Sequence, residues 1–446
     1  MKEQAEAEAV ARAKVAGPRA RRAGRAWGVV SGVAGPIAAA LILAGTCWVL
    51  LVRDGRPDLV KAEDYIAAGR YAAAAKMAES YLTNDPRNTR ALMILSRSRA
   101  ALGDYEGIVD ALRRISDESV KKPEALYVSG QALRLLGRAR EAEEAFRGCV
   151  ARSPDGWRGH PFDARVQLLQ IYGLEERHDD FVALAWDSYE RMPARLKLSF
   201  LVMRTRLELE QAPPEVNART LATMVAKDPD DPHALGGLAA ARAREGRMEE
   251  ARELLSRAVT LDPGDAELRE KLMDVLQKLG RLDELADVLA ARPEGAGDRA
   301  KTQAFLGVVA EARGDLDAAA AAFARAARLD PGQYEYPYKF SRVLALQGRL
   351  VEAQARLADR DRIQKARAAL REAWGTFADV YESDPDRVEP AMLVGMGRAC
   401  EGLGWNREAR AWYREAMRHD PDNDEARTAL ERLPARPDGA SPAQPR

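Results

Sequence analysis

Small and apolar residues recur along this chain at the spacing of amphipathic helices, and glycines punctuate them at a fixed interval. Three of these glycines lie 34 residues apart, and four more, further along the chain, keep the same interval. The seven positions are Gly69, Gly103, Gly137, Gly246, Gly280, Gly314 and Gly348. A fixed period of this length predicts a solenoid, in which one helical hairpin is repeated and stacked. Because solenoids expose a long continuous surface, the pattern favours a binding scaffold.

Other residue types recur at fixed distances after several of the turn glycines. After Gly137, a small Ala142, a large Phe146 and a closing Pro154 follow at five, nine and seventeen residues. Glycine adopts the left-handed backbone that ends one helix, small residues let two helices approach, and proline ends the second helix. Equivalent residues follow Gly246, Gly314 and Gly404. The pattern therefore predicts a helix–turn–helix unit.

These columns resemble the tetratricopeptide repeat, a helical hairpin of 34 residues. The segment from Glu124 to Pro154 shows the resemblance best, and the resemblance covers residues 57 to 433. It implies an all-α fold, a right-handed α-solenoid of about ten such repeats. It also implies that the first helix of each repeat lines a concave groove, which binds proteins or peptides.

Two interruptions divide the predicted array. Pro213-Pro214 stands where a turn glycine is expected, which predicts a splayed hairpin. Neither glycine nor proline occurs from Arg349 to Trp374, which predicts one helix of about 25 to 33 residues, or one kinked near Asp359–Asp361. We therefore expect regular repeats at 55–156, degenerate repeats at 157–230, regular repeats at 232–348, a long helix or irregular repeat at 349–388, a last repeat with a capping helix at 390–433, and a disordered tail at 434–446.

A stretch of 26 residues without charge, from Trp27 to Val52, precedes the repeats. As a helix it would be roughly 39 Å long, enough to cross a hydrocarbon core of about 30 Å. Basic residues crowd segment 1–26, and positive charge favours the cytoplasmic side. The sequence therefore predicts a transmembrane signal anchor at 27–52 in a single-pass protein of the bacterial inner membrane. Its N-terminus would be cytoplasmic and its repeats extracytoplasmic.

Three other interpretations of this front end stay open. A cleaved signal peptide would need a small-x-small site after the apolar core, and no clear one follows. A lipid on Cys47 would need glycine or alanine before it, where the chain has Thr46. An anchored adaptor with its repeats in the cytosol, like organelle import receptors, has the same order of anchor and repeats.

Composition narrows the choice of function. Lysine plus arginine equal aspartate plus glutamate at 69 each, and this balance argues against nucleic-acid binding. The four histidines are scattered, and no phosphate-binding loop or paired cysteine motif occurs. Cys149 and Cys400 occupy core columns of different repeats. We therefore expect no catalytic residue, cofactor or metal, and an enzyme is the most distant alternative.

Partners are expected on the first helix of several repeats. The tetratricopeptide geometry assigns the candidate groove to Tyr127, Gln131, Arg134, His233, Tyr338, Lys339, Arg342 and Arg398. The aromatic run from Gln333 to Phe340 could be a ledge for an extended peptide. The alternative, which the pattern favours, is packing between repeats. Segment 349–382 is a candidate for self-association, because it breaks the repeat and presents extra apolar surface.

Replacing Gly314 by valine should destabilise the array. The turn requires a left-handed backbone, which a β-branched side chain adopts only with strain. Thermal unfolding should show a lower melting temperature, and an unchanged one would show that the turn is wrongly assigned.

Overall fold

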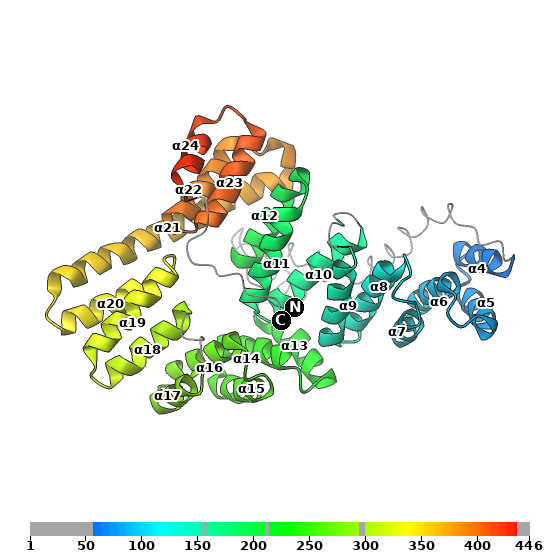
Figure 1. The fold of residues 1–446 in the computed structure, drawn as a ribbon, viewed down its shortest axis with the longest axis horizontal. Helices are drawn as coiled ribbons and strands as arrows, with labels where there is room; N and C mark the ends of the chain where they lie inside the picture. The colour runs from blue at the N-terminus through cyan, green and yellow to red at the C-terminus, as the bar shows by residue number, and fades with distance from the viewer. Residues whose placement is uncertain (1–56, 154–155, 157–158, 210–213, 294–298, 435–446) are drawn as a thin grey trace, which may run out of the picture. The chain divides into compact units, whose positions relative to one another are not determined.

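The structure is a computed structural model that describes residues 57–153, 156, 159–209, 214–293 and 299–434. Within these ranges the chain forms 21 α-helices and no strand (Figure 1). The chain divides into two compact units, which we call unit 1, residues 1–167, and unit 2, residues 168–446.

The predicted transmembrane anchor, 27–52, and the basic segment before it lie outside the described residues. Of the helices that are described, none combines the length and the apolar character needed to cross a membrane.

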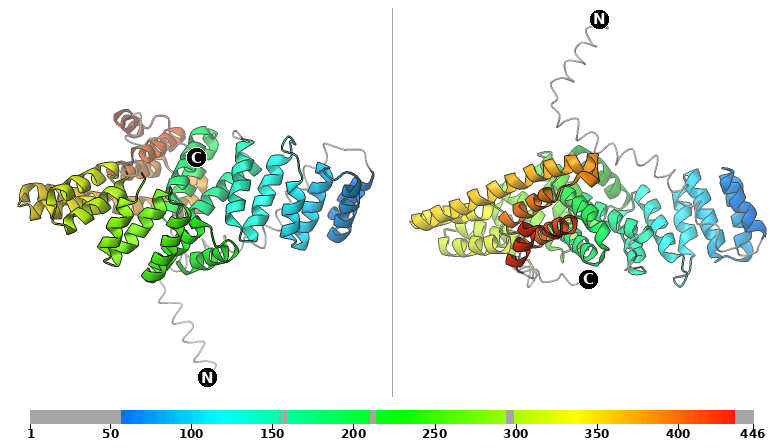
Figure 2. Two further views of the ribbon diagram at one scale, coloured as in Figure 1. Left: turned by 60° about the horizontal axis from the view of Figure 1, so that its bottom comes forward. Right: turned by 90° about the horizontal axis from the view of Figure 1, so that it is seen from above.

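Helices in unit 1 follow one another as antiparallel pairs (Figure 2). They are α4 (Pro57–Ala67), α5 (Tyr71–Asn84), α6 (Thr89–Leu102), α7 (Tyr105–Arg113), α8 (Lys122–Leu135) and α9 (Ala139–Ala151), followed by the start of α10 (His160–Leu174).

Unit 2 begins inside α10 and continues the alternation of helices. Its helices are α11 (His178–Arg191), α12 (Ala194–Leu209), α13 (Pro214–Lys227), α14 (Pro232–Arg244), α15 (Met248–Leu261), α16 (Ala266–Lys278), α17 (Leu282–Ala290), α18 (Ala300–Ala312), α19 (Leu316–Leu329), α20 (Glu335–Leu346), α21 (Leu350–Ser383), α22 (Pro390–Gly402), α23 (Asn406–His419) and α24 (Asp424–Arg432). A short 3-10 helix, Pro385–Arg387, separates α21 from α22.

Glycine occupies the left-handed position at eight hairpin turns. These are Gly69, Gly103, Gly137, Gly246, Gly280, Gly314, Gly348 and Gly404, with φ between 72° and 81°. At Gly314 an added Cβ would meet no atom within 4 Å, so the backbone conformation alone requires glycine there.

A small residue on the first helix faces a large ring on the second helix in three repeats. An added Cβ on the glycine would lie 2.7–2.9 Å from three carbons of that ring. The pairs are Gly130 with Phe146, Gly307 with Phe323, and Gly397 with Tyr413. All three rings are buried, and burying one phenylalanine contributes about 1.5–3 kcal/mol. This small–large contact holds the two helices of a repeat together.

Asparagine or aspartate begins the first helix of several repeats. The Asn88 side chain accepts the Ala91 amide at 3.0 Å, and Asp265 accepts the Leu268 amide at 2.9 Å. Such N-caps satisfy amides that have no partner inside the helix and contribute about 1 kcal/mol each. The short loops between repeats are therefore themselves stabilising.

The two helices of the repeat with Pro213-Pro214 have different neighbours. Helix α12 packs against α11 and α23, whereas α13 packs against α14. Figure 1 shows them diverging from one another. The structure therefore has no regular hairpin at this repeat.

Helix α21 runs without interruption through the second irregular region. It contains 34 residues, more than the sequence indicated, and it is helical without a break through Asp359–Asp361. Its buried side chains include Ile363, Leu370, Trp374 and Phe377. Its first half packs against α20 and its second half against α22, so one helix serves two repeats.

Unit 2 closes on itself where α11 and α12 pack against α21 and α23. We call this the closure contact, with Tyr189, Arg204, Glu408 and Glu415 at its centre. The Tyr189 hydroxyl donates to Glu415 Oε1 at 3.2 Å, and Arg204 Nη2 donates to Glu408 Oε1 at 2.8 Å. Tyr189, Arg204 and Glu415 are all at most 5% exposed. Buried groups of this kind must keep their partners, so the contact has one defined register.

The Trp186 ring belongs to the same contact. The guanidinium carbons of Arg204 and Arg407 lie 4.9 Å and 4.4 Å from its centroid. Tyr189 meets the ring edge-on at 5.4 Å. Because Arg407 belongs to α23, this cation–π contact links the beginning of unit 2 to its last repeat.

Gly307→Ala should destabilise unit 2 by up to about 2 kcal/mol. The new methyl group would overlap the rigid Phe323 ring, and overpacking costs about 1–3 kcal/mol, against roughly 1 kcal/mol gained in helix propensity. Gly375→Ala is the matched control, because a Cβ there meets nothing within 4 Å and should stabilise α21 by up to about 1 kcal/mol. Chemical denaturation measures both changes, and equal effects would refute the small–large contact.

Candidate protein-binding surfaces

Two of the predicted groove residues in unit 1 are part of the core. Tyr127 is 7% exposed and Gln131 is 8% exposed. Gln131 Nε2 donates to the Tyr127 hydroxyl at 2.7 Å, and the Tyr127 ring lies 4.8 Å from the ring of His160. Both side chains are therefore buried in this structure, and His160, at the start of α10, packs against Tyr127. Arg134, one turn further along α8, is exposed.

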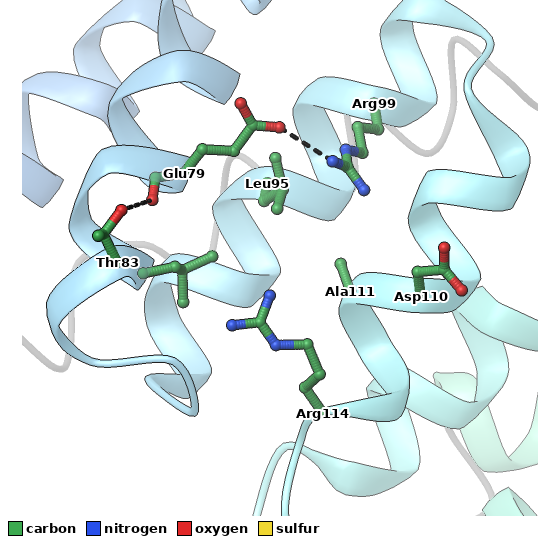
Figure 3. A pocket seen from close by; sticks show the side chains of 8 residues that line it. Glu79, Thr83, Leu95, Arg99, Asp110, Ala111 and Arg114 are labelled. Carbon is green, nitrogen blue, oxygen red and sulfur yellow. Dashed lines mark hydrogen bonds and ion pairs between the residues drawn. The ribbon is translucent and has the colours of Figure 1, made fainter.

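Unit 1 has an open cleft that the sequence did not indicate (Figure 3). Its volume is about 380 Å³, and α5, α6 and α7 line it. Leu82 and Leu95, both buried, give it an apolar floor. Glu79, Arg99 and Arg114 form polar walls. The cleft could hold an apolar side chain flanked by polar groups.

Both arginines of this cleft already make hydrogen bonds. Arg99 donates to Glu79 Oε1 at 2.9 Å and to the Gly107 carbonyl at 2.7 Å. Arg114 donates to the carbonyl of Pro86. These bonds hold the arginine heads in place without a ligand, so they fix the shape of the cleft. The repeat pattern in the sequence does not indicate this cleft, because the residues that line it come from two repeats.

His233 lies beside two aspartates. Single ligand atoms of His233, Asp262 and Asp265 are all within 4.8 Å of one another. Asp265 caps α16, and Asp262 accepts the amides of Gly264 and Asp265 at 3.0 Å and 3.2 Å. The cap of α16 and the turn before it therefore account for the two carboxylates, and the cluster carries no argument for a metal.

The remaining candidates lie on α20 and α22. Tyr338 is 46% exposed, Lys339 is half-buried, and Arg342 and Arg398 are exposed. Arg342 pairs with Glu311 at 2.6 Å, and Arg398 pairs with Glu425 at 2.9 Å. Exposed pairs of this kind are weak, so a partner could replace them.

The aromatic run on α20 divides between core and surface. Tyr336 is 5% exposed and belongs to the core shared with α18 and α19, where Phe340 packs against it. Tyr334 and Tyr338 face α21, where the guanidinium carbons of Arg367 and Arg360 lie 5.9 Å and 5.8 Å from their ring centroids. Packing between helices therefore explains most of the run, and Tyr338 is left as its exposed part.

The two cysteines within the described residues are buried and free. Burial raises the pKa of the Cys149 thiol to about 12. A thiol with such a pKa stays protonated and unreactive at neutral pH. Cys149 therefore acts as a small apolar core residue.

Another surface of unit 2 contains a cluster of charged side chains that are buried or partly buried. It is the face of α14, α16 and the start of α18, which contacts the turn between α10 and α11. Burial, and then the negative charge of Asp179, raise the pKa of Glu267 to about 7, whereas Lys271 and Arg299 oppose the shift. Arg299 donates to Glu270 at 3.0 Å and 3.1 Å and pairs with Asp179.

Comparison with known proteins gives the class of the repeats. Models of the tetratricopeptide repeat match residues 59–119 and 214–266 in one form, and 123–155 and 390–423 in another. The chain therefore contains tetratricopeptide repeats, which are generally non-enzymatic scaffolds. No feature of the matched repeats points to catalysis.

One curated relative shares part of the chain. The TPR repeat-containing protein YpiA of Bacillus subtilis (strain 168) is 25% identical over 217 residues, which are 48% of this chain and 49% of YpiA. The match thus spans about half the length of that relative.

Solved structures resemble the chain weakly. MamA from Desulfovibrio magneticus RS-1 is 20% identical, with a TM-score of 0.31 over 39% of this chain and 97% of its own. Cut9–Hcn1, an APC/C hetero-tetramer, is 15% identical, with a TM-score of 0.38 over 85% and 90%. PilW, a type IV pilus biogenesis factor, is 15% identical, with a TM-score of 0.30 over 53% and 96%. These likenesses carry no information on function.

Acidification should stabilise unit 2 through Glu267. Its folded pKa lies above the unfolded value of 4.5, so its contribution is fully present below pH 4.5 and is lost as pH rises through about 7. Glu267→Gln should therefore reduce the fall in the free energy of unfolding between pH 5 and pH 8, measured by urea denaturation. Glu253→Gln, which removes an exposed carboxylate on α15, is the matched control. Parallel pH profiles for wild type and Glu267→Gln would contradict the burial of this carboxylate.

Proposed function

We propose that this chain is a non-enzymatic scaffold whose repeats bind protein partners, held at a membrane by residues 27–52. The repeats would lie on the outer side of a bacterial cytoplasmic membrane and serve envelope assembly, secretion or polysaccharide export. The uncharged stretch and the basic residues before it support the anchor and its orientation. The tetratricopeptide repeats support the binding role.

Two exposed arginines at the same repeat position give the strongest support for partner binding. Arg342 and Arg398 both stand six residues before a turn glycine, on first helices of their repeats. Their side chains are 51% and 64% exposed, although the neighbouring positions Val343 and Ala399 are buried. Two long cations at one repeat position, with no role in the core, suit contact with a partner protein.

Photocrosslinking tests whether α20 meets a partner. A photoreactive amino acid at position 342 should give protein adducts in irradiated cells. The same residue at position 328, an exposed arginine on the neighbouring α19, should not. Arg342→Ala should weaken binding of the captured partner several-fold, and Arg328→Ala should leave it unchanged. Adducts at 328 alone, or at neither position, would contradict the assignment.

Membrane topology separates the two placements of the repeats. Protease added to sealed cells should cut the region after Gly55 if the repeats lie outside. Protection of the repeats, with cleavage only after the cytoplasmic membrane is opened, would instead support a cytosol-facing adaptor. A chain recovered wholly in the soluble fraction would contradict the anchor.

A further inference from the structure

The turn between α10 and α11 has a glutamate at the left-handed position that glycine occupies in eight other hairpin turns. Glu176 has φ 56° and is the one non-glycine residue with positive φ in the described ranges. This conformation costs about 1–2 kcal/mol for a residue with a side chain. An outlier of this kind points to a role for the side chain. Glu176 Oε1 lies 2.5 Å from Arg244 Nη2, at the end of α14.

Three cations of unit 2, which we call the basic triad, face this turn. They are Arg244, Lys271 and Arg299. Lys271 Nζ donates to the backbone carbonyl of Glu175 at 3.0 Å, and Arg299 pairs with Asp179. Lys271 is surrounded closely enough that burial lowers its pKa. The triad therefore meets two carboxylates and one carbonyl of a segment that is remote in sequence.

The surface also fits the turn in shape. A Cβ on Gly237 would lie 2.9 Å from the Cα of Glu175 and 3.3 Å from the carbonyl oxygen of Leu174. Gly237 stands nine residues before its turn glycine, and the same position of the next repeat is Lys271. At this repeat position, Gly237 leaves room for the backbone of the turn. Lys271, at the same position of the next repeat, donates to the backbone carbonyl of Glu175.

The turn also has charge contacts of its own. Arg177 donates to Glu175 Oε2 at 3.1 Å and to Asp180 Oδ2 at 2.8 Å, and its guanidinium lies 4.5 Å from the centroid of the Tyr172 ring. Glu175 and Asp180 are therefore engaged within the turn, whereas Glu176 and Asp179 are the acids aimed at the basic triad. The basic triad therefore binds the carboxylates of Glu176 and Asp179.

We infer that the face of α14, α16 and α18 is a recognition site for an acidic segment of a partner protein, and that the chain's own turn, Glu175–Asp179, occupies it in cis. This inference rests on the proposed scaffold function and names the chemistry of the partner. The two ion pairs, Glu176–Arg244 and Asp179–Arg299, are partly exposed and worth about 0–1 kcal/mol each, no more than the strain at Glu176. These charge contacts are therefore the exchangeable part of the cis contact.

Occupancy of the site by the turn should lower its affinity for an added acidic segment. A site occupied in cis for nine-tenths of the time binds a ligand about ten times more weakly than a free site. Weakening the turn's contacts should therefore raise the affinity for an added acidic segment. The closure contact would meanwhile hold the other end of α11 on α23, so release of the turn need not open unit 2.

A peptide titration on the full-length chain tests this inference. The probe is a labelled synthetic peptide of residues 173–182, and its control carries glutamine and asparagine at positions 176 and 179. Glu176→Gln with Asp179→Asn removes both carboxylate charges and leaves the backbone strain at position 176 unchanged. At nine-tenths occupancy, the acidic peptide should bind this double variant up to about tenfold more tightly than wild type. Adding Lys271→Gln should abolish the gain.

Two results would overturn the inference: equal peptide affinity for wild type and the double variant, or equal binding of the neutral control peptide. Hydrogen exchange on wild type gives a second measurement that needs no variant. Saturating acidic peptide should raise exchange at residues 174–180, and unchanged exchange would refute displacement. Failure of the inference leaves cross-links at position 342 unaffected, whereas failure of the scaffold function removes them.

Discussion

The continuity of α21 is the constraint on which the arrangement of unit 2 depends. Gly348 and Gly404, the last two turn glycines, are 56 residues apart, 22 more than the period. An insertion of 22 residues adds about six whole helical turns, so the last repeat attaches on nearly the same side of α21. It also moves the last repeat about 33 Å along the helix axis. This displacement allows α23 to meet α11 and α12. A break in α21 would remove that contact.

The closure contact brings together the two regions where the repeat pattern fails. The degenerate repeats supply Trp186, Tyr189 and Arg204, and the displaced last repeat supplies Glu408 and Glu415. Its buried polar groups add little net stability, because their desolvation offsets their attraction. They do specify which surfaces meet. The same unit also places the turn at Glu175–Asp179 against α14, α16 and α18.

Much of the fold could be predicted because the repeats are local. The glycine turns, the small–large pairs and the closing prolines each depend on contacts within one period, which a single sequence displays. The turn at Glu176 could not be found this way, since its left-handed conformation is stabilised by Arg244, which is 68 residues away in the chain. Likewise, Tyr127 and Gln131 occupy groove positions of the repeat, but both are buried, and His160 of α10 packs against Tyr127. Surfaces formed by remote segments therefore required the structure.

A double-mutant cycle on Arg204 and Glu408 tests the closure of unit 2 most directly. Their side chains lie 2.8 Å apart and are 6% and 16% exposed, although 204 residues separate them in the chain. The free energy of unfolding would be measured for wild type, Arg204→Ala, Glu408→Ala and the double variant. Closure predicts a coupling energy of about 1 kcal/mol or more, within the range seen for residues in contact. Additive effects, with no coupling, would contradict the closed arrangement.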